Sequence, residues 1–138
     1  VAPDLEDRAL ETIVETVAAF GMQGILVSNT TISRPDSLRS PRKTETGGLS
    51  GPPLMSLSTQ MLARFHAANS HGLTLIGAGG IATGADALAK IRAGAAAVQF
   101  YSAMVFEGPG MVVRVKRDLA ARLRAEGFAS VAEAVGAR

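Results

Sequence analysis

The sequence predicts an α/β protein built on a parallel sheet. Short apolar runs at residues 25–27, 73–76 and 96–100 alternate with longer segments of helical periodicity. Strands that alternate with helices pair in parallel through right-handed crossovers. Fifteen glycines and only 4% aromatic residues suit tight strand-to-helix turns better than an all-β sandwich. Hydrophobic residues make up 47% of the 138 residues, which is enough for one packed core.

The first two elements are a helix over residues 3–20 and a strand over 25–27. Pro3 suits a first helical position, the acidic residue after it favours the positive end of a helix, and Gly21 can end one. The strand is short and rich in branched apolar residues, so we expect it to be buried on both faces. The helix would bury one stripe, formed by Leu5, Ala9, Leu10, Ile13, Val14, Val17 and Phe20.

A long segment without periodicity, from Thr30 to about Leu57, separates this strand from the next helix. The segment is rich in proline and glycine, and a loop of this length is normally functional or disordered. Ser58 is predicted to cap the helix that follows, and a strand over 73–76 then leads into the glycine-rich turn 77–80. The buried face of that helix would comprise Met61, Leu62 and Phe65.

The last elements have clear boundary signals. Thr83 and Asp86 resemble a capping box for a helix that Gly94 ends, and a third strand covers 96–100. A longer helix follows residues 108–110, and Ser130 with Glu133 marks a last short helical turn. The long helix would bury Met111, Val112, Val115, Leu119 and Leu123, and expose Arg114, Lys116, Arg117, Arg122 and Arg124.

Three strands are too few for most parallel sheets, whose faces and edges need to be covered. A (β/α)8 barrel has eight strands and about 250 residues. We therefore predict that residues 1–138 are the C-terminal portion of a (β/α)8 TIM barrel, namely its last three strands and their helices. The chain would then be part of a single domain.

Composition narrows the possible functions. Fourteen basic and twelve acidic residues nearly balance, and one tyrosine without tryptophan offers little for bases to stack on, so no nucleic-acid partner is expected. The absence of cysteine excludes disulfides and thiolate metal sites, and is compatible with a reducing cytoplasm. No apolar run reaches the roughly 18 residues of a membrane span, so we expect a soluble segment. His66 and His71 have no partner at ligand spacing, so no metal site is predicted.

Two predicted strand ends have features of an anion site. The turn 77–80 follows one strand and Tyr101-Ser102 follows the next, and both can direct backbone N–H groups at a phosphate. Barrels commonly bind phosphate after strands seven and eight. The glycines would equally suit a tight turn that packs a helix on a strand. Their position after successive strands favours the phosphate site.

Polar residues also follow the first strand, as Ser28-Asn29-Thr30-Thr31. Active-site residues of barrels project from such strand ends, and an asparagine amide can read a carbonyl and a ring N–H together. The alternative, which the residues alone favour, is a strand exit that hydrogen-bonds its own backbone. The basic residues Arg34, Arg39, Arg42 and Lys43 could steer an anionic substrate, although a solvated loop explains them more simply.

Taken in order, these segments resemble dihydroorotate dehydrogenases of the membrane-associated, quinone-reducing class. SNTTISRP at 28–35 and FEGPG at 106–110 look like that class rather than the soluble fumarate- or NAD-linked one. The likeness covers nearly the whole chain in unbroken order. The other matching stretches are VAPDL at 1–5, TGGLSGPPL at 46–54, LSTQ at 57–60, GAGGIATGADALAKIRAGA at 77–95, VQFYSA at 98–103, VKRDL at 115–119 and GFASVAEAVGA at 127–137.

The resemblance implies an FMN-dependent oxidoreductase that oxidises dihydroorotate to orotate in de novo pyrimidine (UMP) biosynthesis, with quinone as the electron acceptor. By position, Ser28 would contact FMN, while Asn29 and Thr30 would bind the orotate ring. Serine stands at 28 and 102 where the family usually has threonine, and it keeps the hydroxyl. The other flavin-binding positions, mainly around the phosphate, would be Gly51, Gly80, Tyr101 and Ser102.

The resemblance also implies what this chain lacks. The family's serine base, its flavin-contacting lysine and its quinone-tunnel helices would lie upstream of Val1, so we assign no catalytic residue here and expect the chain alone to be inactive. Its partners would be dihydroorotate or orotate, quinone and the remainder of its barrel, at the cytoplasmic side of the inner membrane. Two hypotheses stay open on the residues alone: half of a non-redox barrel isomerase or synthase that binds phosphate, and a non-catalytic module.

Overall fold

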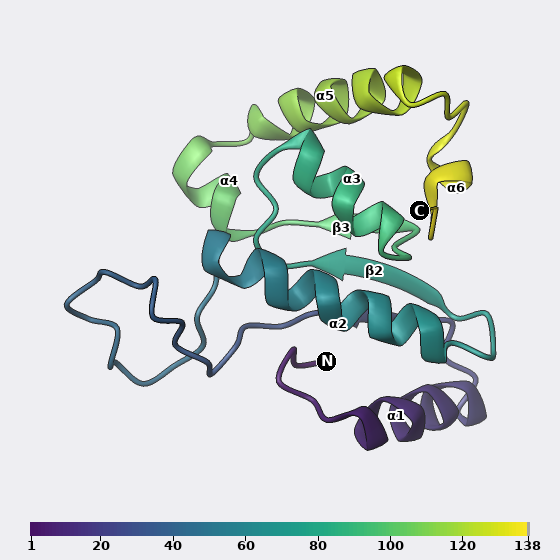
Figure 1. Cartoon of the computed structure of the whole chain (residues 1–138), viewed down its shortest axis with the longest axis horizontal. Coiled ribbons are helices and arrows are strands. Elements are labelled where there is room, and N and C mark those ends of the chain that lie inside the picture. The colour runs from purple at the N-terminus through teal and green to yellow at the C-terminus, as the bar shows by residue number, and fades with distance from the viewer. Residues whose placement is uncertain (138) are drawn as a thin grey trace.

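The computed structural model describes residues 1–137, which form a three-stranded parallel sheet and its helices (Figure 1). The strands are β1 (Gly24–Val27), β2 (Thr74–Ala78) and β3 (Ala97–Gln99). The helices are α1 (Asp7–Ala19), α2 (Met55–Ala68), α3 (Gly84–Arg92), α4 (Ser102–Glu107), α5 (Met111–Ala125) and α6 (Val131–Ala134), and a 3-10 turn, η1 (Pro52–Leu54), precedes α2.

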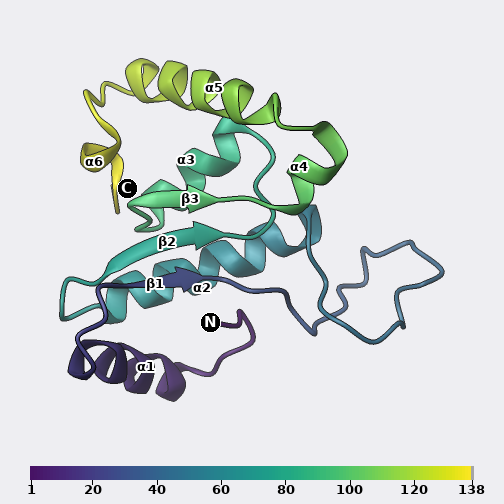
Figure 2. The ribbon, with the colours of Figure 1, turned by 180° about the vertical axis from the view of Figure 1, so that it is seen from behind.

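The sheet is wound in one direction. Its spatial order, β1-β2-β3, follows the chain, and both strand pairs are parallel. The connecting helices α2 and α3 cover the same face of the sheet, so that the strands lie in front of them in the view from behind (Figures 1 and 2). A doubly wound sheet would carry helices on both faces, whereas a barrel carries them only outside. The structure thus confirms the predicted class, an α/β fold that forms part of a (β/α)8 barrel.

The core lies between the sheet and its helices. Ile25, Val27 and Leu75 are buried in it, but Leu26 is 47% exposed. The expectation that the first strand is buried on both faces was therefore wrong. Alternate side chains of a strand point to opposite faces, and no helix in residues 1–137 covers the face that carries Leu26. The helices contribute Leu10, Val14, Met61, Leu62 and Phe65 to this core.

Two helix starts differ from the prediction. Helix α1 begins at Asp7 rather than at Pro3, because the Asp4 carboxylate accepts hydrogen bonds from Thr31 and Ser33 and draws residues 3–6 toward the loop after β1. Helix α2 begins at Met55, directly after η1, so Ser58 lies inside the helix and is not its cap. The short helix α4 was not predicted. The last predicted strand is also shorter, covering 97–99.

The other boundary signals are confirmed. The Asp86 amide donates to Thr83 Oγ1 at 3.1 Å, and the Thr83 amide donates to Asp86 Oδ2 at 2.9 Å, which completes the capping box. The hydroxyl of Ser130 caps α6 by accepting from the Glu133 amide. No helix within residues 1–137 is both long and apolar enough to cross a membrane.

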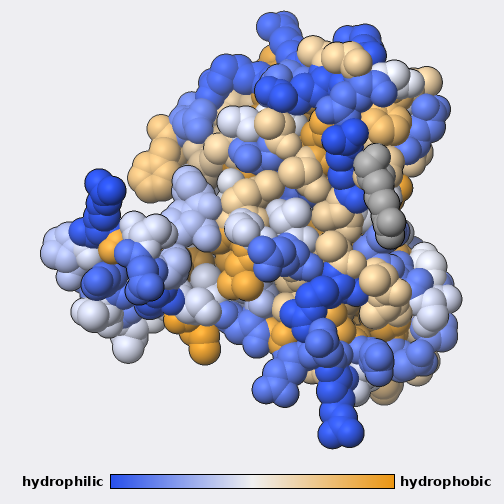
Figure 3. Space-filling model, in the orientation of Figure 1, coloured by the Kyte–Doolittle hydropathy of each residue, from blue (hydrophilic) through white to orange (hydrophobic). Residues whose placement is uncertain are grey.

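The loop between β1 and η1 is held by one arginine. The Arg34 guanidinium donates to the carbonyl oxygens of Lys43 and Glu45, each at 3.0 Å, and of Gly47 at 2.6 Å. Thr31 and Leu49 close the base of the loop through two backbone hydrogen bonds. Arg34 therefore orders the loop. The loop and the outer surface of α5 are mainly hydrophilic (Figure 3).

Candidate functional site

A cavity of about 770 Å³ lies at the carboxyl ends of the three strands. Its size is within the range of small-molecule sites, about 300–1,000 Å³. All seven residues predicted to bind cofactor or substrate line it: Ser28, Asn29, Thr30, Gly51, Gly80, Tyr101 and Ser102. Sequence reasoning missed other lining residues, among them Val1, Leu26, Ser50, Ile81, Gln99, Phe100, Phe106 and Glu107.

Strand register brings Gly80 and Tyr101 to neighbouring positions. Ala78 and Gln99 are Cα partners across β2 and β3, and each is followed two residues later by one of these site residues. The backbone amides of Gly80, Ile81 and Tyr101 donate to no backbone carbonyl of residues 1–137. Unpaired amides that line a cavity are the donors with which loops bind phosphate. The predicted juxtaposition of the two turns is therefore present.

The glycines of the β2 turn also serve packing. Gly79 and Gly80 have φ of +96° and +81°, a region that other residues rarely adopt. A Cβ at Gly80 would lie 2.5 Å from the backbone nitrogen and Cα of Met55. The turn thus rests directly on the first residue of α2. The packing explanation offered for these glycines is therefore confirmed, and the phosphate explanation stays a prediction for amides that line the cavity.

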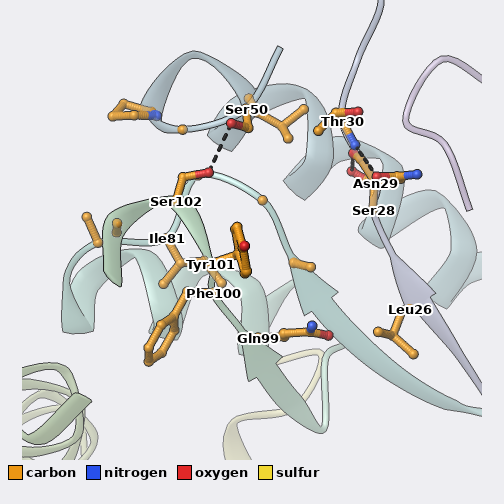
Figure 4. Close-up of a pocket in the computed structure, with 18 of the residues that line it drawn as sticks. Leu26, Ser28, Asn29, Thr30, Ser50, Ile81, Gln99, Phe100, Tyr101 and Ser102 are labelled. Carbon is orange, nitrogen blue, oxygen red and sulfur yellow. Dashed lines mark hydrogen bonds between the residues drawn. The ribbon is translucent and has the colours of Figure 1, made fainter. Parts of the chain in front are cut away.

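A third segment, the turn before η1, closes one end of the cavity. The Ser102 hydroxyl donates to the Ser50 hydroxyl at 2.9 Å, so α4 and this turn face each other (Figure 4). Gly51 has φ +79°, and a Cβ there would meet no atom within 4 Å. Ser50 could have been suspected from the sequence, because it directly precedes a glycine already assigned to the flavin.

The polar residues after β1 lie at another part of the cavity (Figure 4). Ser28 is only 8% exposed, and its hydroxyl donates to the Asn29 carbonyl at 2.9 Å. Asn29 Oδ1 accepts from the Thr30 amide at 2.9 Å, as in the backbone-bonded alternative. The Thr30 side chain packs on Gly48, where a Cβ would lie 1.9 Å from Thr30 Oγ1. Asn29 and Thr30 both line the cavity, and the Thr30 amide donates to the Asn29 side chain as that alternative predicts.

The cavity offers few side chains that titrate. Among the described lining residues these are Tyr101 and Glu107, and Glu107 forms an ion pair with Arg114. Within residues 1–137, no group of three or more histidine, aspartate or glutamate side chains could hold a metal ion. The lining thus combines apolar surface, hydroxyls and free amides. It suits the binding of a planar, phosphorylated ligand better than side-chain acid–base chemistry.

The fold and the cavity together define a class: a β/α-barrel protein whose cavity lies at the strand ends, between turns with unpaired backbone amides. A family model described as dihydroorotate dehydrogenase matches residues 1–123. The chain belongs to this family, and its relatives place it in the quinone class. The resemblance noted in the sequence is thereby confirmed.

Curated relatives match almost the whole chain. A dihydroorotate dehydrogenase (quinone) from Azorhizobium caulinodans is 61% identical over 99% of this chain and 38% of its own length. The mitochondrial protein of that name from Mus musculus is 46% identical over 99% of this chain and 34% of its own. A crystal structure of DHODH from Eimeria tenella in complex with ferulenol superposes with a TM-score of 0.93, at 43% identity, over 99% of this chain and 36% of the other. The chain thus spans little more than a third of the relatives it matches.

Proposed function

We propose that this chain forms part of an FMN-dependent oxidoreductase that oxidises dihydroorotate to orotate in de novo pyrimidine (UMP) biosynthesis, with quinone as the acceptor. Residues 1–138 would be the C-terminal part of a single FMN-binding barrel domain. The observation that carries the proposal is one cavity lined by all seven residues assigned from the family. The names of the relatives supply the reaction.

The residues present fit FMN. The free amides of Gly80, Ile81 and Tyr101 suit a dianionic phosphate, and a turn with Gly51 lies across the cavity. The exposed apolar residues of the lining suit a planar ring: Tyr101 is 77% and Leu26 47% exposed. When bound, FMN would supply hydride acceptance. The chain's own part is to hold the phosphate and one side of the ring.

Asn29 and Thr30 would hold the substrate. The side-chain oxygen of Asn29 accepts a hydrogen bond from the Thr30 amide. The Nδ2 group of Asn29 would donate to a ring carbonyl or to the carboxylate of orotate. The Thr30 hydroxyl, seated against Gly48, supplies a second polar contact. Because both follow β1 and the phosphate turns follow β2 and β3, substrate and phosphate would occupy different parts of one cavity.

The remaining functions would come from the rest of the protein. The serine base of the family would lie upstream of Val1, so we propose that the group that removes the substrate proton belongs to the rest of the protein. The uncovered sheet face and the exposed Phe106, at 88%, are surfaces that the other barrel strands and helices would cover. Quinone access and peripheral attachment to the cytoplasmic side of the inner membrane would likewise belong to that remainder.

The test uses two preparations: the 138-residue chain, and a chimaera in which it replaces the matching segment of the Azorhizobium caulinodans relative. We expect the chimaera to bind FMN and to oxidise dihydroorotate with a soluble quinone, and the chain alone to bind FMN weakly and show no turnover. A folded chimaera that stays colourless in excess FMN would contradict the proposal. Turnover by the chain alone would contradict the assignment of the base.

A further inference from the structure

Lys90 is a fully buried cation that the proposed site does not use. It lies on α3 with an exposed fraction of 0%, and its ammonium nitrogen donates to the hydroxyl of Ser58 on α2, which is equally buried. The charged group near it is Asp86, on the same helix. Burial of an ammonium group costs several kcal/mol unless the structure compensates for it. The position of Lys90 therefore calls for a reason beyond the stability of the fold.

Ser58 connects this lysine to the phosphate turn. Because an ammonium group only donates, the Ser58 hydroxyl hydrogen must point away from it, toward a carbonyl. Three carbonyl oxygens are within reach: Leu54 at 2.8 Å, Gly79 at 3.0 Å and Met55 at 3.2 Å. Leu54 ends η1 and Met55 begins α2, whereas Gly79 belongs to the turn after β2. The Ser58 hydroxyl, whose one hydrogen these three oxygens share, thus lies in hydrogen-bond contact with both the start of α2 and the turn.

The Gly79 carbonyl determines where the Gly80 amide points. The peptide bond between them is trans, so its N–H is directed opposite to its C=O. The Gly79 carbonyl oxygen lies 3.0 Å from Ser58 Oγ, on the side of α2; Ser58 does not line the cavity, whereas both glycines do. The Gly80 N–H is therefore directed away from Ser58, and it has no backbone acceptor in residues 1–137.

We propose that Lys90 is a positioning residue: through Ser58 it fixes the Gly79–Gly80 peptide so that the Gly80 amide faces the phosphate of the bound ligand. That the ligand is FMN rests on the proposed function. The orientation of the Gly80 amide by Lys90 and Ser58 requires only that the ligand carry a phosphate. Donation by Lys90 to the Ser58 oxygen polarises the O–H and strengthens its bond to the Gly79 carbonyl. A dianion at the turn would in return stabilise the buried charge.

The protonation of Lys90 supports this coupling. Burial lowers the pKa of Lys90 from 10.5 to about 8, and the Asp86 carboxylate opposes that decrease. A phosphate dianion near the turn would favour the charged form and raise the pKa again. Phosphate binding should therefore take up a proton above pH 8. From α2, Lys90 faces the uncharged Ser58, and from β2 it faces Gly77.

The test compares FMN with riboflavin, which has the same ring and no phosphate. In the chimaera, we expect Lys90→Met and Ser58→Ala each to weaken FMN affinity about tenfold and to change riboflavin affinity by less than about twofold, as one strong hydrogen bond predicts. Lys116→Met, on the exposed face of α5, is the matched control and should change neither. Equal losses for both flavins would show a merely structural role and overturn the proposal, as would unchanged FMN affinity.

Two further measurements keep the outcome decisive. If Lys90→Met fails to fold, the unaltered chimaera should still lose affinity for FMN, and not for riboflavin, between pH 7 and 9.5; a flat FMN profile overturns the proposal. If the chimaera binds no FMN, the proposed function fails, and inorganic phosphate becomes the probe. Phosphate should then shift the Gly80 amide resonance of the chimaera but not that of Ser58→Ala. Identical shifts in both would overturn the inference independently of the flavin.

Discussion

Ser102 and Ser50, which are 52 residues apart in sequence, share a hydrogen bond of 2.9 Å between their hydroxyl groups. This bond joins the first residue of α4 to the turn that contains Gly51, and both lie at the cavity. Removing one hydroxyl should let the turn move away from the strand ends. An exposed hydrogen bond of this kind contributes about 0.5–1.5 kcal/mol.

We therefore expect Ser50→Ala to weaken FMN binding by the chimaera about two- to tenfold, measured by quenching of flavin fluorescence. Ser70→Ala, an exposed serine far along the chain, is the matched control and should leave affinity unchanged. Equal affinity of Ser50→Ala and the parent would mean that the turn is held without this bond.

The crowding at Gly80 can be separated from its backbone conformation. Gly80 and Gly127 have nearly the same φ, +81° and +83°, but a Cβ at Gly80 would meet Met55 at 2.5 Å and one at Gly127 would meet nothing. Gly127→Ala should cost about 1–2 kcal/mol in unfolding free energy from strain alone. Gly80→Ala should cost at least about 2 kcal/mol more and abolish FMN binding. Equal losses of stability in urea unfolding would contradict the packing described for the turn.

Substrate binding should depend on a glycine that does not itself touch the ligand. A Cβ at Gly48 would overlap Thr30 Oγ1, so Gly48→Ala must displace the Thr30 side chain. We expect the KM for dihydroorotate to rise about tenfold, with FMN affinity unchanged. Gly110→Ala, where a Cβ would meet only Arg114 at 4.0 Å, is the control. A lower FMN affinity with an unchanged KM would place Thr30 at the flavin instead.

The loop after β1 should loosen in acid. Burial would raise the pKa of Asp4, but hydrogen bonds from Thr31, Ile32 and Ser33 to the carboxylate outweigh it, and the pKa is below its ordinary value of 3.8. A lowered folded-state pKa means that this stabilisation is complete above the unfolded value and is lost as the pH falls through the folded one.

We expect the Ile32 amide resonance of isoleucine-labelled chimaera to be constant from pH 7 to 5 and to move only below about pH 4, toward its position in Asp4→Asn. The control Asp36→Asn should titrate like the parent. A midpoint above the ordinary aspartate value would show that burial prevails over the hydrogen bonds.

Lys90 should make the ligand-free protein more stable at high pH. Between the lowered pKa of about 8 and the ordinary value of 10.5, the unfolded chain holds a proton that the folded chain has released. The free energy of unfolding therefore rises with pH in this window. The urea midpoint of the chimaera, relative to that of Lys90→Met, should increase from pH 8 to 10, while the difference from Lys116→Met stays constant. If the urea midpoints of the chimaera, Lys90→Met and Lys116→Met change in parallel with pH, Lys90 does not titrate in this range.

The sequence was sufficient for features with a local or periodic cause. The capping box of Thr83 and Asp86 is a signal within one helical turn, and the meeting of Gly80 with Tyr101 follows from the regular register of parallel strands. The predicted start of α1 was wrong because residues 3–6, expected to be helical, are held outside the helix by the contact of Asp4 with Thr31, 27 positions away.

The contacts that support the site from behind had no local or periodic signal in the sequence. Ser58 resembles a helix cap in the sequence, and Lys90 resembles any surface lysine of an amphipathic helix; only packing of α2 on α3 shows that they meet. The Ser50–Ser102 bond likewise joins distant segments. Leu26 was placed wrongly for a different reason, since an apolar run in the sequence does not show whether both faces of the strand are covered, and Leu26 is 47% exposed.

The two edge strands have a practical consequence. The outer edge of β1 already accepts the Val1 amine at Leu26 O, 3.0 Å away, and β3 offers its other side to no strand within residues 1–137. The unpaired N–H and C=O groups of an edge strand can pair with any extended polypeptide. The yield of soluble 138-residue chain in cells should therefore depend on co-expression. A polypeptide that supplies neighbouring strands, made at the same time, can pair with β1 and β3 before copies of the chain aggregate with one another. Adding the same polypeptide after purification should not restore the soluble yield.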